Sequence, residues 1–215
     1  MTNPTRAAQE TAQTLDRGLR LLHLVADTPG LTVTEAAARL GVGRAAIYRL
    51  VGALAGHGMV RRDAAGRLRL GAGLLQLARR AQPLIADAAL PALRRLAEEV
   101  GATAHLTVAE GAEAVALVVV EPSWTAFHVA YRSGSRHPIE RGAAGRAILA
   151  GRQGEHGLVS TAGELQPGAY GVATAVLGVE GLEASVGVVA LAPLELATVG
   201  PHVQTAATTI ADALS

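Results

Sequence analysis

The sequence predicts an α+β protein with two parts, a largely helical N-terminal part and a C-terminal part built on an antiparallel sheet. Apolar residues recur at helical spacing up to about residue 100, apart from one short alternating stretch. Beyond Gly101 the apolar period changes to two, which is typical of strands. The predicted strands come in runs with helices before and after them, which favours α+β over α/β architecture.

Charge also divides the chain into two parts. Residues 1–82 hold twelve Arg and five acidic residues, whereas residues 83–215 hold seven Arg and thirteen acidic residues. A basic segment joined to an acidic one is typical of a module that meets phosphate groups attached to one that does not. The net charge of +1 hides this division.

Composition excludes several classes of site. The chain contains no Cys, so a disulfide framework, a thiolate metal site and a Cys nucleophile are ruled out, and a reducing interior is expected. The longest run of branched apolar residues, Val115–Val120, is far shorter than the ~20 residues that a membrane helix needs. The first ten residues do not have the apolar core of a signal peptide. We therefore expect a cytoplasmic protein with no membrane contact.

The first helix is expected over Thr14–Asp27, where Thr28-Pro29-Gly30 ends it. Its apolar side is wider than a single neighbour requires, so it could serve both the domain core and a partner chain. The residues of that side are Leu15, Leu19, Leu21, Leu22, Leu24 and Val25.

Two short helices across a Gly turn are expected over residues 32–56. Thr32 and Glu35 have the spacing of a capping box, which starts the first of these helices, and Gly41 with Gly43 breaks it. In the second helix, apolar residues at helical spacing must face inward and leave a cationic outer face near its N-terminus. The inward residues are Ile47, Leu50, Val51 and Leu54. Such a pair is a helix-turn-helix, whose second helix fits the DNA major groove.

A short β-hairpin is expected directly after this pair, over Val60–Leu70. Apolar and Arg residues alternate on both sides of the turn Asp63–Gly66, so the hairpin carries four Arg. An Arg-bearing hairpin behind a recognition helix is typical of a winged helix-turn-helix and can lay guanidinium groups against phosphates. The candidate DNA contacts are Thr34, Arg44, Ala45, Ala46, Tyr48, Arg49, Arg61, Arg62 and Arg67.

The domain boundary is expected near Pro83. Gly71–Gly73 should form a hinge before a connecting helix that Pro83 ends, and a second helix over Leu84–Val100 should be kinked or split at Pro91. This interpretation gives a DNA-binding domain over residues 1–71, a linker helix over 72–82 and a C-terminal domain over 83–215.

The C-terminal domain should contain an antiparallel sheet with a short helix inserted. We expect the short helix over Ala143–Ala150 and a final helix with Pro201 in its first turn. That helix should face the sheet through Val203, Ala207, Ile210 and Leu214. The expected strands are 103–109, 115–121, 127–131, 158–160, 172–177 and 184–191.

Several segments of the chain follow the pattern of a known family: TLDRGLRLLHLVAD, LTVTEAAARLGVGRAAIYRLVGALAGHGMVRRD, RLRLG and GSRHPIERGAAGRAILA. Through them the chain resembles the IclR family of bacterial transcriptional regulators. The resemblance implies a homodimer, or a dimer of dimers, joined through the N-terminal helix. It also implies a GAF-like C-terminal domain that binds a small organic acid or aromatic effector.

The chain departs from the family pattern in the recognition helix and in the length of the C-terminal domain. Ala45 and Ala46 replace the family's two hydroxyl residues after Arg44, so they can contact thymine methyl groups but cannot hydrogen-bond a base. The family's additional helices after the AILAG segment are missing. A lid over the effector site is therefore expected to be absent.

The resemblance places an effector carboxylate on the backbone N–H groups at the start of the short helix, at Ala143, Ala144 and Gly145. The family's polar effector contacts correspond here to Thr161, Gly171, Gly187 and Val189, which predicts a more apolar site. Phe127 belongs to a small group of aromatic residues that could stack on a ring, although filling the core is an equally good interpretation. We therefore expect an aromatic or aliphatic acid, or a pocket that is no longer used.

Other kinds of site have little support. No two of the seven His have the short spacing of metal ligands, and the segment Gly142–Arg146 does not have the spacing and Lys of a phosphate-binding loop. We expect no cofactor, no metal and no catalytic activity. Two alternatives stay open: a DNA-binding regulator whose shortened second domain only dimerises, and a small-molecule-binding or catalytic protein without DNA binding.

Overall fold

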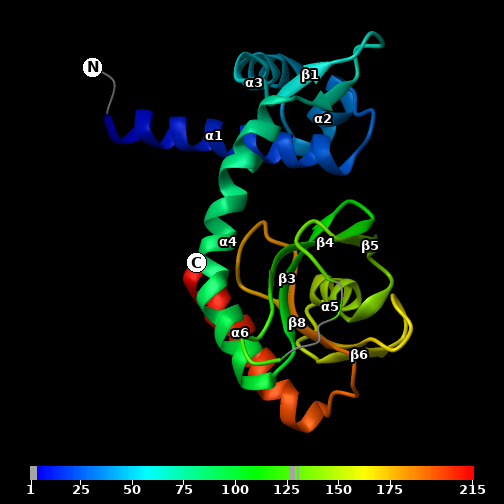
Figure 1. Cartoon of the computed structure of the whole chain (residues 1–215). Coiled ribbons are helices and arrows are strands. Elements are labelled where there is room, and N and C mark those ends of the chain that lie inside the picture. Colours follow the sequence, from blue (N-terminus) through cyan, green and yellow to red (C-terminus); the bar gives the residue numbers. More distant parts are fainter. Residues whose placement is uncertain (1–3, 126–128, 130) are drawn as a thin grey trace. The chain divides into compact units, whose positions relative to one another are not determined.

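The computed structural model describes residues 4–125, 129 and 131–215, and the side-chain surroundings from residue 12 onward. The chain divides into two compact units, residues 1–81 and residues 82–215 (Figure 1). Each unit has a buried apolar core of its own. Within the described residues, no helix is both long enough and apolar enough to cross a bilayer.

The N-terminal unit contains three helices followed by a two-stranded hairpin. Its elements are α1 (Pro4–Asp27), α2 (Val33–Leu40), α3 (Arg44–Gly56), β1 (Val60–Arg62) and β2 (Leu68–Leu70). Its core gathers one apolar side from each helix with one residue from each strand. The fully buried members are Leu21, Leu31, Ala36, Ile47 and Leu68. The predicted helix-turn-helix and hairpin are therefore present, and α1 begins ten residues before the predicted start.

Local chemistry explains where α2 begins and ends. The Glu35 N–H donates to Thr32 Oγ1 at 3.2 Å, and the Thr32 N–H donates to Glu35 Oε2 at 2.8 Å. This reciprocal pair is the capping box that the spacing predicts. Gly41 ends α2 with φ +65°, which is the left-handed conformation that glycine adopts readily.

One helix, α4 (Gly73–Val100), replaces the two helices expected on either side of Pro83. The prediction that Pro83 ends a helix is wrong, because both Pro83 and Pro91 lie inside α4. A proline within a helix removes a single backbone hydrogen bond, whereas a helix of this length keeps its other bonds on both sides. The sequence rule that a proline ends a helix therefore overestimated the free-energy cost of Pro83 inside α4.

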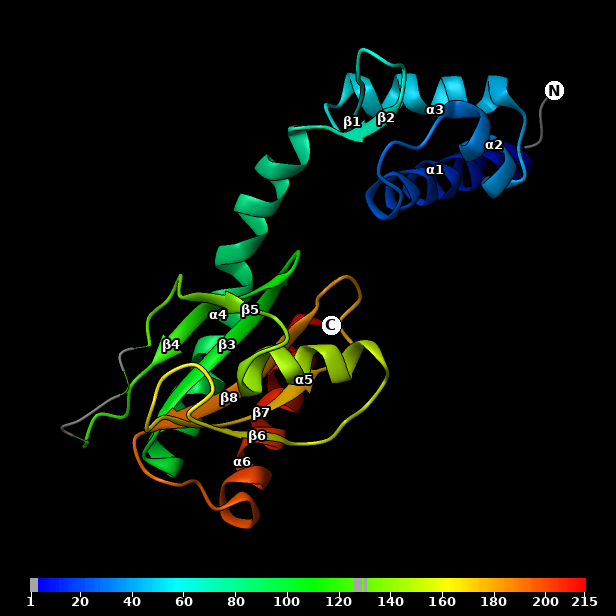
Figure 2. The same ribbon diagram turned by 90° about the vertical axis from the view of Figure 1, so that its right-hand side faces the viewer.

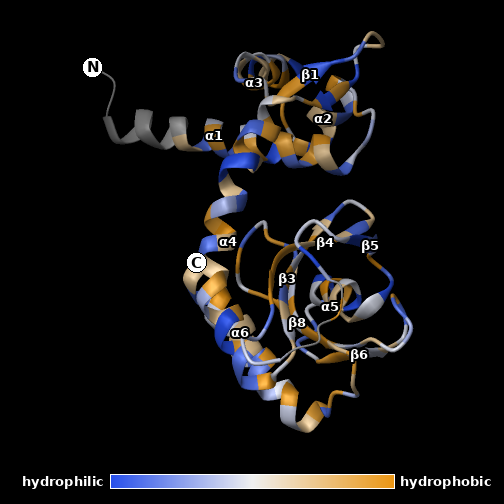
Figure 3. Cartoon of the chain, in the orientation of Figure 1, coloured by the Kyte–Doolittle hydropathy of each residue, from blue (hydrophilic) through white to orange (hydrophobic). Residues whose placement is uncertain are grey.

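The C-terminal unit is organised around a six-stranded sheet of order β5-β4-β3-β8-β7-β6, in which every neighbouring pair is antiparallel. The α+β prediction is confirmed. The strands are β3 (Thr103–Glu110), β4 (Glu113–Val120), β5 (Arg136–Pro138), β6 (Val159–Ala162), β7 (Tyr170–Val176) and β8 (Ala184–Ala190). Figure 3 shows that the central strands are coloured mainly as hydrophobic.

Helices cover both faces of this sheet. The second half of α4 and helix α6 (Leu196–Leu214) pack on one face, and α5 (Gly142–Arg152) lies on the other (Figure 2). The alternation of β7 shows this division, because Val172 belongs to the core with α4 and α6 whereas Ala173 packs against α5. The predicted inward residues of α6 are buried or half-buried in the first core.

Two further details differ from the sequence prediction. Helix α6 begins at Leu196, so Pro201 lies inside it and not in its first turn. Residues 126–128 and 130 of the strand predicted over 127–131 lie outside the described residues, and Val129 and Tyr131 are not in a strand. The edge strand β5 was not predicted, because three residues are too few to show a period.

Candidate nucleic-acid interface and ligand cavity

The outer face of α3 is exposed near its N-terminus. Arg44, Ala45, Tyr48 and Arg49 are exposed, and Ala46 is half-buried. The opposite side of the helix is buried in the core. These side chains are therefore available to a partner, as a recognition helix requires. Thr34, in the first turn of α2, is also exposed.

The hairpin adds positive charge beside this face. Arg61, Arg62 and Arg67 are exposed, and β1 is one of the hydrophilic segments in Figure 3. Arg69 differs, because its Nε donates to Asp63 Oδ2 at 3.1 Å. Its charge is therefore partly compensated.

Asp63 organises the tip of the hairpin. Its Oδ1 accepts hydrogen bonds from the backbone N–H groups of Arg67, at 2.9 Å, and Ala65, at 3.0 Å. The bond from the Arg67 N–H is the main reason why the pKa of Asp63 lies below its usual value. The carboxylate thus fixes the turn that carries Arg67.

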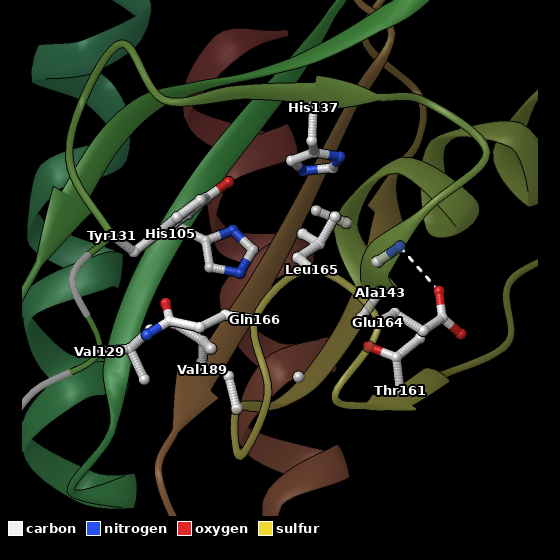
Figure 4. Close-up of a pocket in the computed structure, with 14 residues that line it drawn as sticks. His105, Val129, Tyr131, His137, Ala143, Thr161, Glu164, Leu165, Gln166 and Val189 are labelled. Carbon is white, nitrogen blue, oxygen red and sulfur yellow. Dashed lines mark hydrogen bonds between the residues drawn. The ribbon is translucent and has the colours of Figure 1, made fainter.

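A cavity of about 80 Å³ lies in the C-terminal unit at the start of α5. Figure 4 shows side chains converging on it from β3, β5, the start of α5 and the loop between β6 and β7. Its volume is several times what one water molecule needs, and its surface is mostly apolar. The lining residues are His105, Val129, Tyr131, His137, Gly142, Ala143, Ala144, Thr161, Glu164, Leu165, Gln166, Ala169, Gly171 and Val189.

Five of the residues predicted to contact an effector line this cavity: Ala143, Ala144, Thr161, Gly171 and Val189. The other three do not lie in the described lining. Gly145 packs so tightly against the Ile139 backbone that an added Cβ would lie 2.2 Å from its carbonyl oxygen. Gly187 lies beneath His105, whose Cε1 is 2.9 Å from the position of an added Cβ. Phe127 lies outside the described residues.

The start of α5 is partly capped by a carboxylate of the chain itself. The Gly142 N–H donates to Glu164 Oε2 at 2.9 Å (Figure 4), and Arg146 Nη1 donates to Glu164 Oε1 at 2.8 Å. Arg141 also donates to the Glu164 carbonyl. The Arg146 guanidinium partly compensates the Glu164 charge. Ala143 and Ala144 belong to the first turn, so their N–H groups have no partner within the helix.

His105 brings a neutral ring into the cavity wall. It lies on β3 and is 4% exposed, and its Nδ1 is 3.1 Å from Thr107 Oγ1. Burial, with a smaller contribution from nearby His137, lowers its pKa from 6.5 to about 3. The ring therefore stays uncharged near neutral pH.

Tyr131 and His137 each have a buried polar atom without a partner of normal hydrogen-bond geometry among the described residues. These atoms are the Tyr131 hydroxyl and His137 Nε2. Burial raises the pKa of Tyr131, and the nearby Thr107 hydroxyl acts in the opposite direction. His137 is 8% exposed, and its Nδ1 lies 3.0 Å from the Pro138 carbonyl, so Nδ1 carries the proton. Both residues line the cavity, so these atoms can bond a ligand that enters it.

The polar part of the cavity wall was missed by sequence reasoning. His105, His137 and Glu164 were not assigned to the site, and of the small group of aromatic residues, to which Tyr131 belongs, only Phe127 was assigned. The one local signal was a His within the apolar strand 103–109. The residues come from separate elements, and only the sheet and α5 bring them together.

Comparison with known proteins identifies the class of this chain. The IclR helix-turn-helix domain matches residues 14–64, and the C-terminal domain of the bacterial transcriptional regulator IclR matches residues 80–159. Together the two domains cover more than half of the chain. The chain therefore belongs to the IclR family of bacterial transcriptional regulators, as its sequence motifs predict.

The similar proteins are distant relatives. The HTH-type transcriptional regulator KipR of Bacillus subtilis is 29% identical over 147 residues, which are 66% of this chain and 57% of KipR. The regulator BhcR of Paracoccus denitrificans is 31% identical over 147 residues, which are 63% of this chain and 50% of BhcR. The matched part of the chain thus spans about half the length of these curated relatives.

A solved structure shares the fold over nearly the whole chain. It is an IclR homologue from Microbacterium hydrocarbonoxydans in complex with 4-hydroxybenzoate. The TM-score is 0.53 at 20% identity, and the match covers 94% of this chain and 98% of that one. At this identity the likeness concerns the fold.

Proposed function

We propose that this protein is a ligand-responsive transcriptional regulator that binds operator DNA as a dimer through its winged helix-turn-helix. The observation that carries this proposal is the exposed outer face of α3, which lies on a helix-turn-helix of the IclR family and is followed by a hairpin with three exposed Arg. Binding a chromosome implies a place in the cytoplasm. No described feature favours catalysis.

On the DNA side, we assign Arg44, Tyr48 and Arg49 to the major groove. The exposed Ala45 methyl, with Ala46 beside it, can contact thymine methyl groups, and Thr34 can reach the backbone. The hairpin residues Arg61, Arg62 and Arg67 are assigned to phosphates. All of these residues are exposed except Ala46, which is half-buried.

On the ligand side, we assign the cavity at the start of α5 to a small aromatic or aliphatic acid. The first-turn N–H groups and the dipole of α5 favour an anion. The unpartnered His137 Nε2 and Tyr131 hydroxyl can bond a second polar group, and the mostly apolar wall suits a ring or short chain. The 4-hydroxybenzoate complex of the Microbacterium homologue supports an aromatic acid.

The dimer is assigned to the outer side of α1. Leu15 is 64% exposed and Leu19 is 47% exposed, although both lie on the apolar side of the helix. Burying these leucines against a second copy would remove them from water. A two-fold dimer presents two recognition helices, so we expect a palindromic or nearly palindromic operator.

One DNA-binding experiment tests the proposal. A duplex is selected from a random library with the wild-type protein, and its affinity is measured by fluorescence anisotropy at several salt concentrations. We expect Arg44→Ala to cost about 1–3 kcal/mol on the selected duplex, and Arg67→Ala to weaken all duplexes and reduce the salt slope by about one. Arg132→Ala, an exposed Arg of the C-terminal unit, is the control. Enrichment of no duplex, or indifference to both changes, would refute DNA recognition by this face.

The same assay tests the ligand. Benzoate, 4-hydroxybenzoate, short aliphatic acids and glyoxylate are added in turn, and direct binding is measured by isothermal titration. We expect an aromatic or aliphatic acid to bind and to change the DNA affinity. Tight binding of glyoxylate alone would contradict the assigned chemistry. DNA affinity that no acid changes would favour the alternative in which the shortened domain only dimerises.

A further inference from the structure

Tyr48 and Arg62 form a contact that joins the recognition helix to the hairpin. The guanidinium carbon of Arg62 lies 4.7 Å from the centroid of the Tyr48 ring. Tyr48 is 52% exposed on the outer face of α3, and Arg62 is the exposed last residue of β1. The contact therefore lies on the surface assigned above to DNA and not in the core.

The other two exposed arginines of the hairpin lie elsewhere. Arg61 precedes Arg62 on β1, so its side chain leaves the opposite face of the strand. The Arg67 side chain lies beside Gly30, where its Nη1 is 3.1 Å from the position of an added Cβ. Arg62 is thus the hairpin arginine that the described contacts tie to α3.

The contact holds the Arg62 side chain without neutralising it. A ring attracts a cation through its quadrupole but carries no net charge. In contrast, the ion pair with Asp63 sets a negative charge beside Arg69. Arg62 therefore keeps its full charge for a phosphate, and part of the rotamer freedom that it would lose on binding is already restricted.

We propose that Tyr48 is a positioning residue that holds the Arg62 guanidinium beside α3, so that Arg62 binds a DNA phosphate next to the recognition helix and separately from the tip of the hairpin. This inference rests on the proposed DNA-binding function. It changes the role given to Tyr48 under the proposed function, from a direct contact in the major groove to the support of Arg62, and it separates Arg62 from the other hairpin arginines.

A double-mutant cycle tests the coupling. Tyr48→Leu, Arg62→Ala and the double variant are compared on the duplex selected with the wild-type protein. We expect Tyr48→Leu to weaken binding about two- to five-fold in the wild-type background and to have no effect when Arg62 is already Ala. Arg62→Ala should reduce the salt slope by about one, whereas Tyr48→Leu should leave the slope unchanged because the charge remains.

Two variants serve as controls. Tyr48→Phe keeps the ring face and should therefore keep the coupling energy with Arg62 that Tyr48→Leu removes. Arg61→Ala removes the neighbouring charge, and the effect of Tyr48→Leu should be the same in that background as in the wild type. Equal losses from Tyr48→Phe and Tyr48→Leu would show that the hydroxyl contacts DNA, and additive effects of Tyr48→Leu and Arg62→Ala would show that the two residues act independently. Either result overturns the inference.

A measurement without DNA separates this inference from the proposed function. The Tyr48 ring should shift the NMR resonances of the Arg62 Cδ protons upfield in the free protein, and Tyr48→Leu should abolish the shift. Absence of the shift overturns the inference even if DNA is bound. A normal shift in a protein that enriches no duplex overturns both the DNA-binding function and the positioning role.

Discussion

At the scale of single residues, His105 shows how the sheet changes the chemistry of a side chain. Its ring is buried beside Tyr131, with the two centroids 5.2 Å apart and the planes at 73°, which is the favourable edge-to-face arrangement. Protonation would place a charge in this enclosed position. The cavity wall therefore presents a neutral ring near neutral pH.

We predict that His105 makes the C-terminal unit sensitive to acid. Its pKa is about 3 in the folded state and 6.5 when exposed, so below pH 6.5 the unfolded state binds one more proton and stability falls as pH falls. Between pH 7 and pH 5 this costs roughly 2 kcal/mol. In urea unfolding, the free energy of unfolding should fall between pH 7 and pH 5 in both proteins, and the fall should be smaller in His105→Gln than in the wild type by about this amount. An equal loss in both proteins would contradict the burial of a neutral His105.

At the scale of elements, α2 depends on its capping box. We predict that Thr32→Ala lowers the stability of the N-terminal unit by about 1 kcal/mol, because the Glu35 N–H loses its acceptor. For a unit of this size that corresponds to a fall in Tm of about 4–8 °C, measurable by circular dichroism on the full chain. Thr34→Ala is the matched control, since Thr34 is exposed in the same turn and does not form the cap. A similar fall in both variants would contradict the assigned role.

The elements of the N-terminal unit could be predicted because short-range chemistry fixes them. The pair Thr32 and Glu35, the left-handed Gly41 and the alternation of residues 60–70 each act within a few residues. Helix α4 was predicted incorrectly because the sequence rule weighs Pro83 alone. The bonds on both sides of the proline outweigh its effect.

The cavity could be predicted only in part, because its wall is assembled from distant segments. The small residues at the start of α5 were recognisable from the resemblance to the IclR family. The positions of His105, Tyr131 and His137 depend on the pairing of β3 with β4 and of β4 with β5. The bond from Gly142 to Glu164 joins residues that are 22 positions apart. Helical or strand periodicity carries no information on such pairs.

At the scale of the whole molecule, the exposed leucines of α1 bear on assembly. We predict that Leu19→Glu shifts the protein toward monomer in sedimentation velocity. In a two-fold dimer the two introduced carboxylates would be buried close to each other, and their like charges would repel. The Leu19→Glu variant should also bind a palindromic duplex more weakly. The control is Leu191→Glu, at a similarly exposed leucine of the C-terminal unit, which should leave the mass in solution unchanged. A Leu19→Glu protein with the wild-type sedimentation coefficient would place the interface elsewhere.

The two prolines of α4 have a mechanical consequence. Pro83 lies just after the division between the units at residues 81 and 82, and neither proline has an N–H for the carbonyl four residues earlier, on Arg79 and Asp87. Both prolines are exposed, so water can solvate those carbonyls where α4 bends. Flexing at these points breaks no backbone bond. We therefore expect α4 to bend more easily at Pro83 and Pro91 than elsewhere along its length.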